Sequence, residues 1–560
     1  MDFLSCENII TSEDYWDMII KRKNYADDAE PPCFQDVNSE WRIEYRERIE
    51  GRRLSFSEYG YFTIPKLYGL MDTTAMDATG ITRVQTQPTL ALFGENVMIG
   101  IIDTGIDYRH EAFIDAFGNS RILSIWDQTI EGNPPEGLAY GSEYGNEEIT
   151  RAIKSDNPYE IVPSRDEVGH GTYVAGTAAG SRNINGTFTG VAPKSSIVVV
   201  KLKEAKQYLR DFYIIEKNAH AYAENDIMLG VKYIRNMMVK YAMPMVLCIG
   251  LGTSNTGHTG DSPLGDTLEM LAREDGVAVV CAMGNEGNER HHYYGTYEYN
   301  NVNSVEIRVG DNEPGFCLEM WSDYPDKYSL NIISPLGNRI PISSILLGQT
   351  RKYTFTLENT VVYVDYSLVE TLSGRELIVM LFENPTPGIW QLEVTGEIVV
   401  NGVYNLWLPI SEFLSADTFF VSSDPNITLT SPADVPNVIS VGGYNHNLGI
   451  FYLNSGRGFT ASNVIKPDVV APSVSVYCPL SGLNNEYGYR TGTSIGTAIA
   501  AGSAALMLEW GIVRENLKSM NTRDIKGYMI RGARRSKGRV YPSPEFGYGE
   551  LDVYNIFLEI

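Results

Sequence analysis

Short runs of consecutive apolar residues punctuate the chain before residue 290. Four of them span residues 97–102, 197–200, 245–249 and 277–280. Apolar runs of this length are typical of parallel strands that are buried on both faces of a sheet. We therefore predict four buried strands of a parallel sheet.

Helical spacing replaces these runs in the segments between them. Residues 268–272 form one apolar helical patch, between the third and fourth strands. Between the second and third strands, a core-facing stripe is formed by Ile227, Val231, Ile234 and Met238. Strands that alternate with helices predict an α/β fold with a doubly wound parallel sheet.

The pattern changes between residues 295 and 430. Residues 305–309 alternate strictly between apolar and polar side chains, and four further segments are rich in aromatic and β-branched residues. Turn formers separate several of them, and no stretch of helical period intervenes. These features predict an antiparallel β-sandwich, or jelly roll, inserted into the α/β fold. The four further strands are expected at residues 353–357, 361–366, 377–382 and 390–394.

Three polar motifs can bring an acid, a base and a nucleophile together. Asp103 directly follows the first predicted strand, whereas His170 and Ser494 each stand at the start of a predicted helix. In open α/β sheets, sites form beyond the carboxyl ends of the strands. A serine hydroxyl needs an imidazole to take its proton and a carboxylate to hold that imidazole. The chain order Asp, His, Ser is that of subtilisin.

The residues around these three positions resemble the signature blocks of the subtilase family of serine proteases. The matching blocks are residues 103–107, 170–176 and 492–498. A fourth block, residues 282–287, resembles the segment whose asparagine donates to the oxyanion. The resemblance implies a subtilisin-like endopeptidase in which Asn285 shares that task with the backbone N–H of Ser494.

The same resemblance implies a primary specificity pocket with two walls. An extended protein or peptide substrate would pair with these walls as an added strand. Small residues in them would let the substrate backbone approach closely. The walls would be formed by Gly250, Leu251 and Gly252 on one side and by Ala282, Met283 and Gly284 on the other.

Each of these residues also has an ordinary structural explanation. An Asp at a strand end is commonly a turn former, a Ser before a helix is commonly an N-cap, and Gly-Asn is commonly a turn. Four matching blocks in the family's order favour catalysis. The alternative is a catalytically silent or propeptide-locked subtilase that acts as a binding or signalling pseudoprotease.

The inserted sandwich points to one group within the family. Together with the motifs at residues 124–129, 155–159 and 161–167, it is similar to the clostridial Csp germination proteases. This resemblance implies limited proteolysis that activates a spore cortex-lytic proenzyme, and an association with spores. It also implies autoprocessing of a propeptide that stays bound after cleavage.

The resulting division of the chain has four parts. Residues 1–75 are a propeptide-like segment, with a last strand at 59–68 and a break within 69–76. The subtilase core resumes after the insertion, where residues 437–443 and 466–472 again resemble family blocks. The core is therefore expected at residues 76–294 and 431–560, on either side of a jelly roll at 295–430.

The composition limits the classes of binding partner and the cellular location that we expect. The net charge of −25 argues against a nucleic-acid surface, which needs clustered Lys and Arg. The N-terminus is acidic and lacks the basic and apolar regions of a secretory signal, so we expect synthesis in the cytoplasm. No stretch approaches 18 uninterrupted apolar residues, so no transmembrane segment is expected.

Metal and cofactor chemistry is not indicated. The seven histidines are scattered, with only His291 and His292 adjacent, and no Cys/His spacing resembles a zinc site. We expect no catalytic metal and no required cofactor. The family resemblance implies structural Ca²⁺ in loops of Asp, Asn and backbone carbonyls, at positions that the sequence does not locate.

Overall fold

The computed structural model describes residues 15–21, 33–36, 41–47, 74–299, 303–342, 351–370, 372–415, 417–482 and 485–560. The chain divides into two units, Met1–Met71 and Asp72–Ile560. In the smaller unit, strands β1 (Tyr15–Lys21), β3 (Trp41–Glu47) and β2 (Phe34–Asp36) form an antiparallel sheet in that order. The strand expected at 59–68 and most of the break expected at 69–76 lie outside the described residues.

A nine-stranded sheet forms the centre of the larger unit, with strand order β22-β21-β9-β8-β4-β7-β5-β6 and β23 beside β21. All four apolar runs predicted as strands are strands of this sheet, and they pair in parallel. They are β4 (Met98–Asp103), β7 (Ser196–Lys201), β8 (Met245–Ile249) and β9 (Val277–Ala282). The others are β5 (Ile122–Asp127), β6 (Ser142–Gly145), β21 (Ile439–Asn445), β22 (Ile450–Phe451) and β23 (Val469–Pro472).

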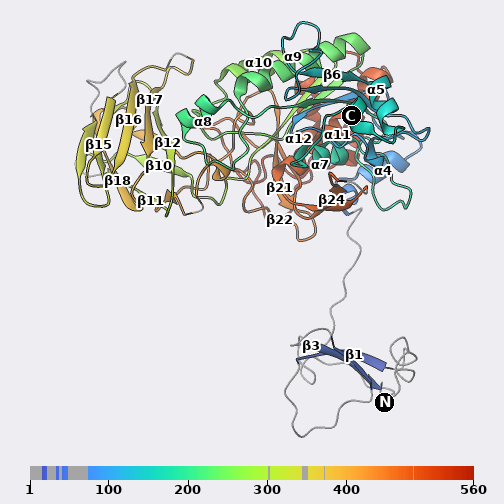
Figure 1. Ribbon diagram of the computed structural model, residues 1–560, viewed down its shortest axis with the longest axis horizontal. Coiled ribbons are helices and arrows are strands. Elements are labelled where there is room, and N and C mark those ends of the chain that lie inside the picture. The colour runs from blue at the N-terminus through green and yellow to red at the C-terminus, as the bar shows by residue number, and fades with distance from the viewer. Residues whose placement is uncertain are drawn as a thin grey trace. The chain divides into compact units, whose positions relative to one another are not determined.

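Helices cover both faces of this sheet because its strands are apolar on both sides (Figure 1). Along β4, Ile99 and Ile101 join the core on the side of α7 (His170–Ala179) and α11 (Thr493–Leu508). Met98 and Ile102 join the core on the side of α9 (Glu224–Tyr241) and α10 (Pro263–Leu271). The predicted doubly wound α/β fold is confirmed, as are the helices predicted around residues 227–238 and 268–272.

The helix α11 runs through the middle of the protein. All of its residues are buried, and its small side chains let it pack against β8, β9 and α7. Within the described part of the chain, the helical stretch Thr493–Val513 is long and apolar enough to cross a membrane, and 89% of its apolar window is buried inside the molecule. The apolar composition of α11 thus serves packing in the core.

Shorter elements complete the α/β part. The helices are α3 (Thr74–Ala78), α4 (Ile81–Thr86), α5 (Asn146–Ile153), α6 (Pro158–Ile161), α8 (Gln207–Tyr213), α12 (Thr522–Gly532) and α13 (Val553–Glu559). A 3-10 turn at Glu111–Phe113 and a π-turn at Glu509–Val513 accompany them. The strands β24 (Val476–Pro479) and β25 (Tyr487–Arg490) form a separate hairpin.

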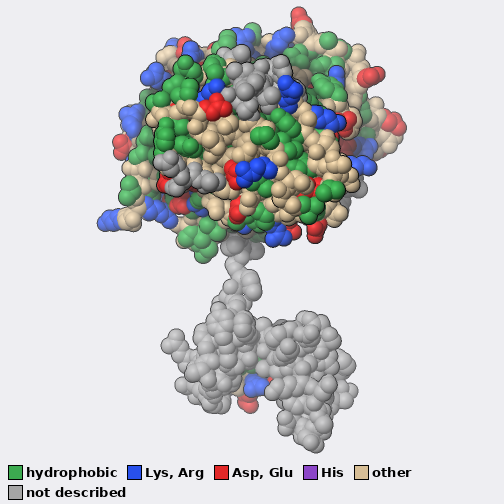
Figure 2. Space-filling view, turned by 90° about the vertical axis from the view of Figure 1, so that its left-hand side faces the viewer, with side chains coloured by type: hydrophobic (Ala, Val, Ile, Leu, Met, Phe, Trp, Pro, Cys, Tyr) green, Lys and Arg blue, Asp and Glu red, His purple; other side chains and the backbone are tan. Residues whose placement is uncertain are grey.

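Two antiparallel sheets form the insertion at one end of the larger unit (Figure 1). One has the order β10-β19-β12-β17-β16-β15 and the other β14-β13-β18-β11-β20. Their apolar side chains share one core, so the predicted β-sandwich is confirmed. The face of the sandwich in Figure 2 mixes hydrophobic side chains with interspersed Lys, Arg, Asp and Glu. The strands are β10 (His292–Thr296), β11 (Asn303–Val309), β12 (Gly315–Ser322), β13 (Lys327–Ile333), β14 (Arg339–Ile342), β15 (Arg351–Phe355), β16 (Thr360–Ser367), β17 (Glu376–Glu383), β18 (Gly388–Ile398), β19 (Val403–Trp407) and β20 (Phe419–Phe420).

The close approach of α9 to β4 gives a first prediction. A Cβ added at Gly100 would lie 2.4 Å from Ile234 Cγ2, whereas a Cβ added at Gly527 in α12 would meet no atom within 4 Å. We expect Gly100→Ala to lower the free energy of unfolding by about 1–3 kcal/mol through overpacking. Gly527→Ala should raise it by roughly 0.5–1 kcal/mol through helix propensity. Denaturant unfolding measures both, and equal effects of the two changes would contradict the packing described here.

Candidate active site

The structure brings Asp103, His170 and Ser494 into one hydrogen-bonded chain. Asp103 ends β4, His170 begins α7, and Ser494 lies in the first turn of α11. His170 Nδ1 lies 2.7 Å from Asp103 Oδ1 and 2.9 Å from its Oδ2. On the other side of the ring, His170 Nε2 lies 3.1 Å from Ser494 Oγ. The imidazole therefore joins a carboxylate to a hydroxyl, as proton transfer from a serine requires.

The surroundings of His170 set its protonation. Burial disfavours the imidazolium, but the charge and hydrogen bond of Asp103, together with the charges of Asp166 and Glu412, outweigh burial and raise the pKa of His170 above its usual value. Asp103 is fully buried and accepts a further hydrogen bond from the backbone N–H of Thr104, 2.7 Å from Oδ1. The ring of Tyr173 packs edge-on against the imidazole, with the centroids 4.8 Å apart. These contacts hold the imidazole in one orientation.

Asn285 is oriented by the start of α11. Its Oδ1 accepts hydrogen bonds from the backbone N–H of Thr493 at 3.1 Å and from the Thr493 hydroxyl at 3.3 Å. An amide whose oxygen faces these donors turns its NH₂ group the opposite way. The backbone N–H of Ser494 has no partner within the helix, because the first four N–H groups of any helix lack one. Two donors and a helix dipole are therefore available where negative charge would develop.

A cleft of about 640 Å³ contains these groups. Ser494, His170 and Asn285 line it, as do residues from α8 and from the insertion. Gly250 borders the whole hydrogen-bonded chain, since a Cβ added there would lie 3.2 Å from His170 Cε1, 3.3 Å from Ser494 Cβ and 3.4 Å from Asp103 Oδ2. Of the residues predicted to form the pocket walls, Gly250, Leu251, Gly252, Ala282 and Gly284 line this cleft.

Met283 differs from the prediction for the walls. Its side chain is fully buried in the core on the side of the sheet that α9 and α10 cover, and it is not among the residues that line the cleft. The reason is the alternation of side chains along an extended segment, which turns Met283 inward between its two neighbours. Only its backbone contributes to this region, because its carbonyl accepts a hydrogen bond from Thr430 N–H at 3.0 Å.

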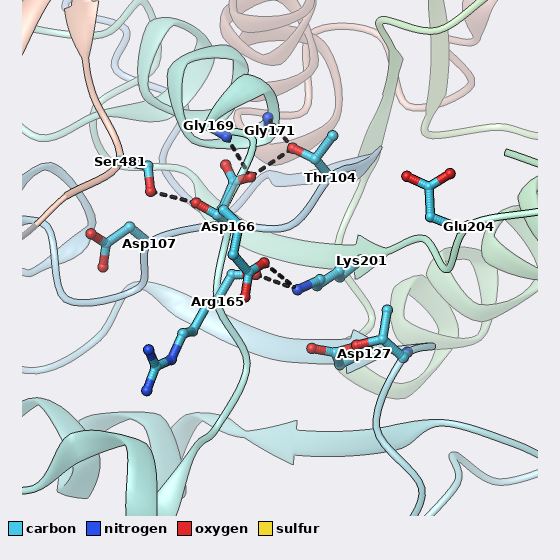
Figure 3. A network of polar contacts seen from close by, with 12 residues as sticks. Thr104, Asp107, Asp127, Arg165, Asp166, Gly169, Gly171, Lys201, Glu204 and Ser481 are labelled. Atoms are coloured by element: carbon cyan, nitrogen blue, oxygen red, sulfur yellow. Dashed lines mark hydrogen bonds and ion pairs between the residues drawn. The ribbon is translucent and has the colours of Figure 1, made fainter. Parts of the chain in front are cut away.

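Asp166 is a buried carboxylate that the sequence did not single out for a role in the site (Figure 3). Its Oδ1 accepts from the backbone N–H of Gly169 at 2.8 Å and from the Thr104 hydroxyl at 2.7 Å. Its Oδ2 accepts from the N–H of Thr172 at 2.8 Å and from its hydroxyl at 2.6 Å. The Thr104 hydroxyl in turn accepts from Gly171 N–H at 2.9 Å. Asp166 therefore ties the residue after Asp103 to the turn that carries His170.

Glu286 connects the site to the insertion. It is buried, and its Oε2 lies 2.9 Å from His291 Nδ1. It also accepts hydrogen bonds from the backbone N–H of Ser411 at 3.1 Å and from the Ser411 hydroxyl at 2.9 Å. Ser411 begins the short 3-10 helix Ser411–Phe413, whose residues line the cleft. The insertion thus contributes directly to the cleft beside Asn285.

Comparison with known proteins agrees with this geometry. The sequence model of the Subtilase family, peptidase S8, matches residues 94–311 and 405–549, on both sides of most of the insertion. The chain belongs to the subtilase family. In structure it resembles the CspB protease of Clostridium perfringens, at 31% identity and a TM-score of 0.76, covering 86% of this chain and 96% of that one.

Curated proteins from Arabidopsis thaliana are similar to this chain in sequence. The subtilisin-like protease SBT3.11 is 24% identical over 482 residues, which cover 79% of this chain and 58% of the relative. SBT1.4 is 34% identical over 215 residues, or 35% of this chain and 25% of the relative. The chain spans at most a little over half the length of these curated relatives. Both of these relatives are named as subtilisin-like proteases. The likeness to the CspB protease extends to the inserted β-sandwich.

The contacts of Asp166 give a second prediction. We expect Asp166→Ala to lower the free energy of unfolding by about 3 kcal/mol or more, because each buried donor left without an acceptor costs about 1–3 kcal/mol. Denaturant unfolding of the full chain measures the change. The control is Asp156→Ala, which alters an exposed aspartate in the loop before α6. A loss of under 1 kcal/mol for Asp166→Ala would show that these hydrogen bonds do not hold the turn.

Proposed function

We propose that this subtilase is a serine endopeptidase in which Ser494 is the nucleophile, His170 the general base and Asp103 the group that orients it. The observation that carries the proposal is the unbroken chain of hydrogen-bond distances from Asp103 through His170 to Ser494. In the proposal, Asn285 Nδ2 and the backbone N–H of Ser494 stabilise the oxyanion.

The proposed reaction is acyl transfer in two halves. Ser494 Oγ attacks the scissile carbonyl as its proton passes to His170 Nε2, and the Asp103 carboxylate stabilises the imidazolium. The imidazolium then protonates the leaving amine, which departs and leaves an acyl-enzyme. Water attacks the acyl group and gives a proton to His170 Nε2, and the imidazolium then returns that proton to Ser494 Oγ as the Oγ–acyl bond breaks and the carboxylic acid product leaves. The chain's own groups suffice for every step, so the proposal requires no cofactor.

The proposed substrate is a protein cut at few positions. The glycine-bordered cleft suits an extended peptide, because glycines let a substrate backbone approach. The likeness to the CspB protease supports a place in the Csp group, for which activation of a spore cortex-lytic proenzyme and association with spores are the implied role. Autoprocessing and retention of an N-terminal propeptide belong to the same proposal.

Active-site labelling tests the function directly. We expect a fluorophosphonate probe to form a covalent adduct with the full chain and none with Ser494→Ala. The control is Ser503→Ala, which removes the hydroxyl of another buried serine of α11. Absence of a Ser494-dependent adduct would favour the silent or propeptide-locked alternatives. Cleavage of the chain itself near residue 72 separates those two alternatives, because a propeptide-locked protease can cut its own chain and a catalytically silent one cannot.

The pH dependence follows from the raised pKa of His170. The imidazole must be neutral to accept the serine proton, so the labelling rate should fall as the pH drops through that pKa, with a midpoint above 6.5. Removing the adjacent charge in Asp103→Asn should move the midpoint to lower pH. Asp275→Asn is the control, because Asp275 is exposed and lies just before the amino end of β9, whereas Asp103 lies at the carboxyl end of its strand. A wild-type midpoint at or below 6.5 would contradict the arrangement.

A further inference from the structure

The cleft that contains Ser494 extends beyond the two glycine-containing walls as far as the insertion. A Cβ added at Gly250, in the first wall, would lie 3.3 Å from Ser494 Cβ, whereas a Cβ added at Gly257 would lie 3.4 Å from Trp321 Cε3 of β12. All four residues line the cleft. The seven residue steps from Gly250 to Gly257 span at most about 25 Å. A substrate strand that follows this wall therefore leads from Ser494 to the insertion.

Hydrogen bonds fix the insertion to the stretch of chain that follows the wall. Arg375 Nη1 donates to Gly257 O at 2.7 Å, and Asn255 Nδ2 donates to Glu319 Oε1 at 3.3 Å. Glu319 is buried and also accepts from Trp321 Nε1 at 3.0 Å. The place of Trp321 beside the cleft is therefore determined by contacts that join the α/β part to the sandwich.

The helix α8 also meets the insertion beside this part of the cleft. In Figure 1 it lies between the α/β part and the sandwich, and a Cβ added at Gly315 of β12 would lie 2.7 Å from Ile214 Cγ2, at the end of α8. Tyr213, the last residue of α8, lines the cleft and is 39% exposed. Its ring is therefore available to a ligand in the cleft.

A turn of the insertion adds an exposed leucine. Leu372 lines the cleft and is 55% exposed. The Glu370 carboxylate holds the turn, because it accepts hydrogen bonds from Leu372 N–H at 3.1 Å and from the Ser373 N–H and hydroxyl at 2.8 Å. Leu377 of β17 lines the cleft as well. We call the four apolar side chains at this end of the cleft the distal subsite: Tyr213, Trp321, Leu372 and Leu377.

Charged side chains beside the distal subsite have partners of their own. Arg375 Nε lies 2.8 Å from Asp323 Oδ1, and Arg210 Nη1 of α8 lies 3.3 Å from Glu204 Oε2. The two carboxylates that hold Trp321 and Leu372 already accept hydrogen bonds, as described above. What the distal subsite offers to a ligand is therefore apolar surface, whose burial against another apolar group is favourable.

We infer that the insertion takes part in substrate recognition, because the distal subsite binds an apolar or aromatic side chain of the substrate on the amino-terminal side of the scissile bond. This inference rests on the proposed endopeptidase function. Ser494 and Asn285 hold the scissile carbonyl, and the residues before it pair with the walls as an added strand. Those residues continue toward Trp321, which a side chain within about seven residues of the bond can reach.

Cleavage of matched peptides by the full chain tests this inference. One cleaved sequence is found by incubation with a tryptic peptide library and mass spectrometry of the new termini. It is then synthesised with three residues before the scissile bond, with five Ser residues added on the amino side, and with one Phe in turn at each added position. We expect the best Phe peptide to exceed both other forms in kcat/KM by about tenfold or more, the scale that burial of a large apolar side chain gives.

Variants of the insertion locate the gain. Trp321→Ala and Leu372→Ser should each lower the ratio of kcat/KM between the best Phe peptide and the Ser peptide by about fivefold or more. Leu372→Ser changes an exposed side chain and serves if Trp321→Ala does not fold, as judged by fluorophosphonate labelling of Ser494. The control is Leu357→Ser, which alters an 81% exposed leucine that does not line the cleft and should keep the wild-type ratio.

Four results would overturn the inference. Wild type could cleave all peptide forms equally well, or the gain could persist in both Trp321→Ala and Leu372→Ser. An equal loss in Leu357→Ser would assign the effect to the insertion as a whole. A gain only from Phe residues added on the carboxyl side would place the contact elsewhere. Failure of the proposed function looks different: labelling and cleavage that do not depend on Ser494 would remove that function and this inference with it.

Discussion

The contact between the Asp103 carboxylate and the His170 imidazole depends on two elements that meet at only one edge of the sheet. Asp103 ends a buried strand, and His170 begins a helix that packs on one face of that sheet. Parallel strands place their carboxyl ends side by side, which also brings the segments after β8 and β9 to the same edge. The site is thus a consequence of the parallel order.

Buried carboxylates hold the loops around this edge. Asp166 accepts four hydrogen bonds, one from Gly169 before α7, two from Thr172 in its first turn and one from Thr104. Glu286 binds His291 and Ser411. A buried carboxylate is unfavourable unless donors surround it. Each therefore fixes several backbone segments at once. The active-site loops are held by polar networks, whereas the strands and helices beneath them are held by apolar packing.

The insertion is part of the cleft as well as a separate sandwich with its own core. Its short helix Ser411–Phe413 is bound to Glu286, and the chain that returns from it carries Thr430 between the two glycine-containing walls. A segment far along the sequence from Gly252 and Gly284 therefore shapes the space beside Ser494. The same insertion interrupts the match to the family model, which resumes at residue 405.

The sequence alone predicted four strands of the central sheet, its main helices, the sandwich and the residues of the hydrogen-bonded chain. These could be predicted because the apolar period and the short motifs are local features of the sequence. The inward turn of Met283, the four hydrogen bonds of Asp166 and the placement of Thr430 were not legible in it. Segments tens to hundreds of residues apart meet in the core that takes in Met283, in the hydrogen bond from Thr104 to Asp166 and in the approach of Thr430 to Gly252 and Gly284. No local pattern marks these contacts. Tertiary structure decided these features, since only packing in space determines which distant groups share a buried volume.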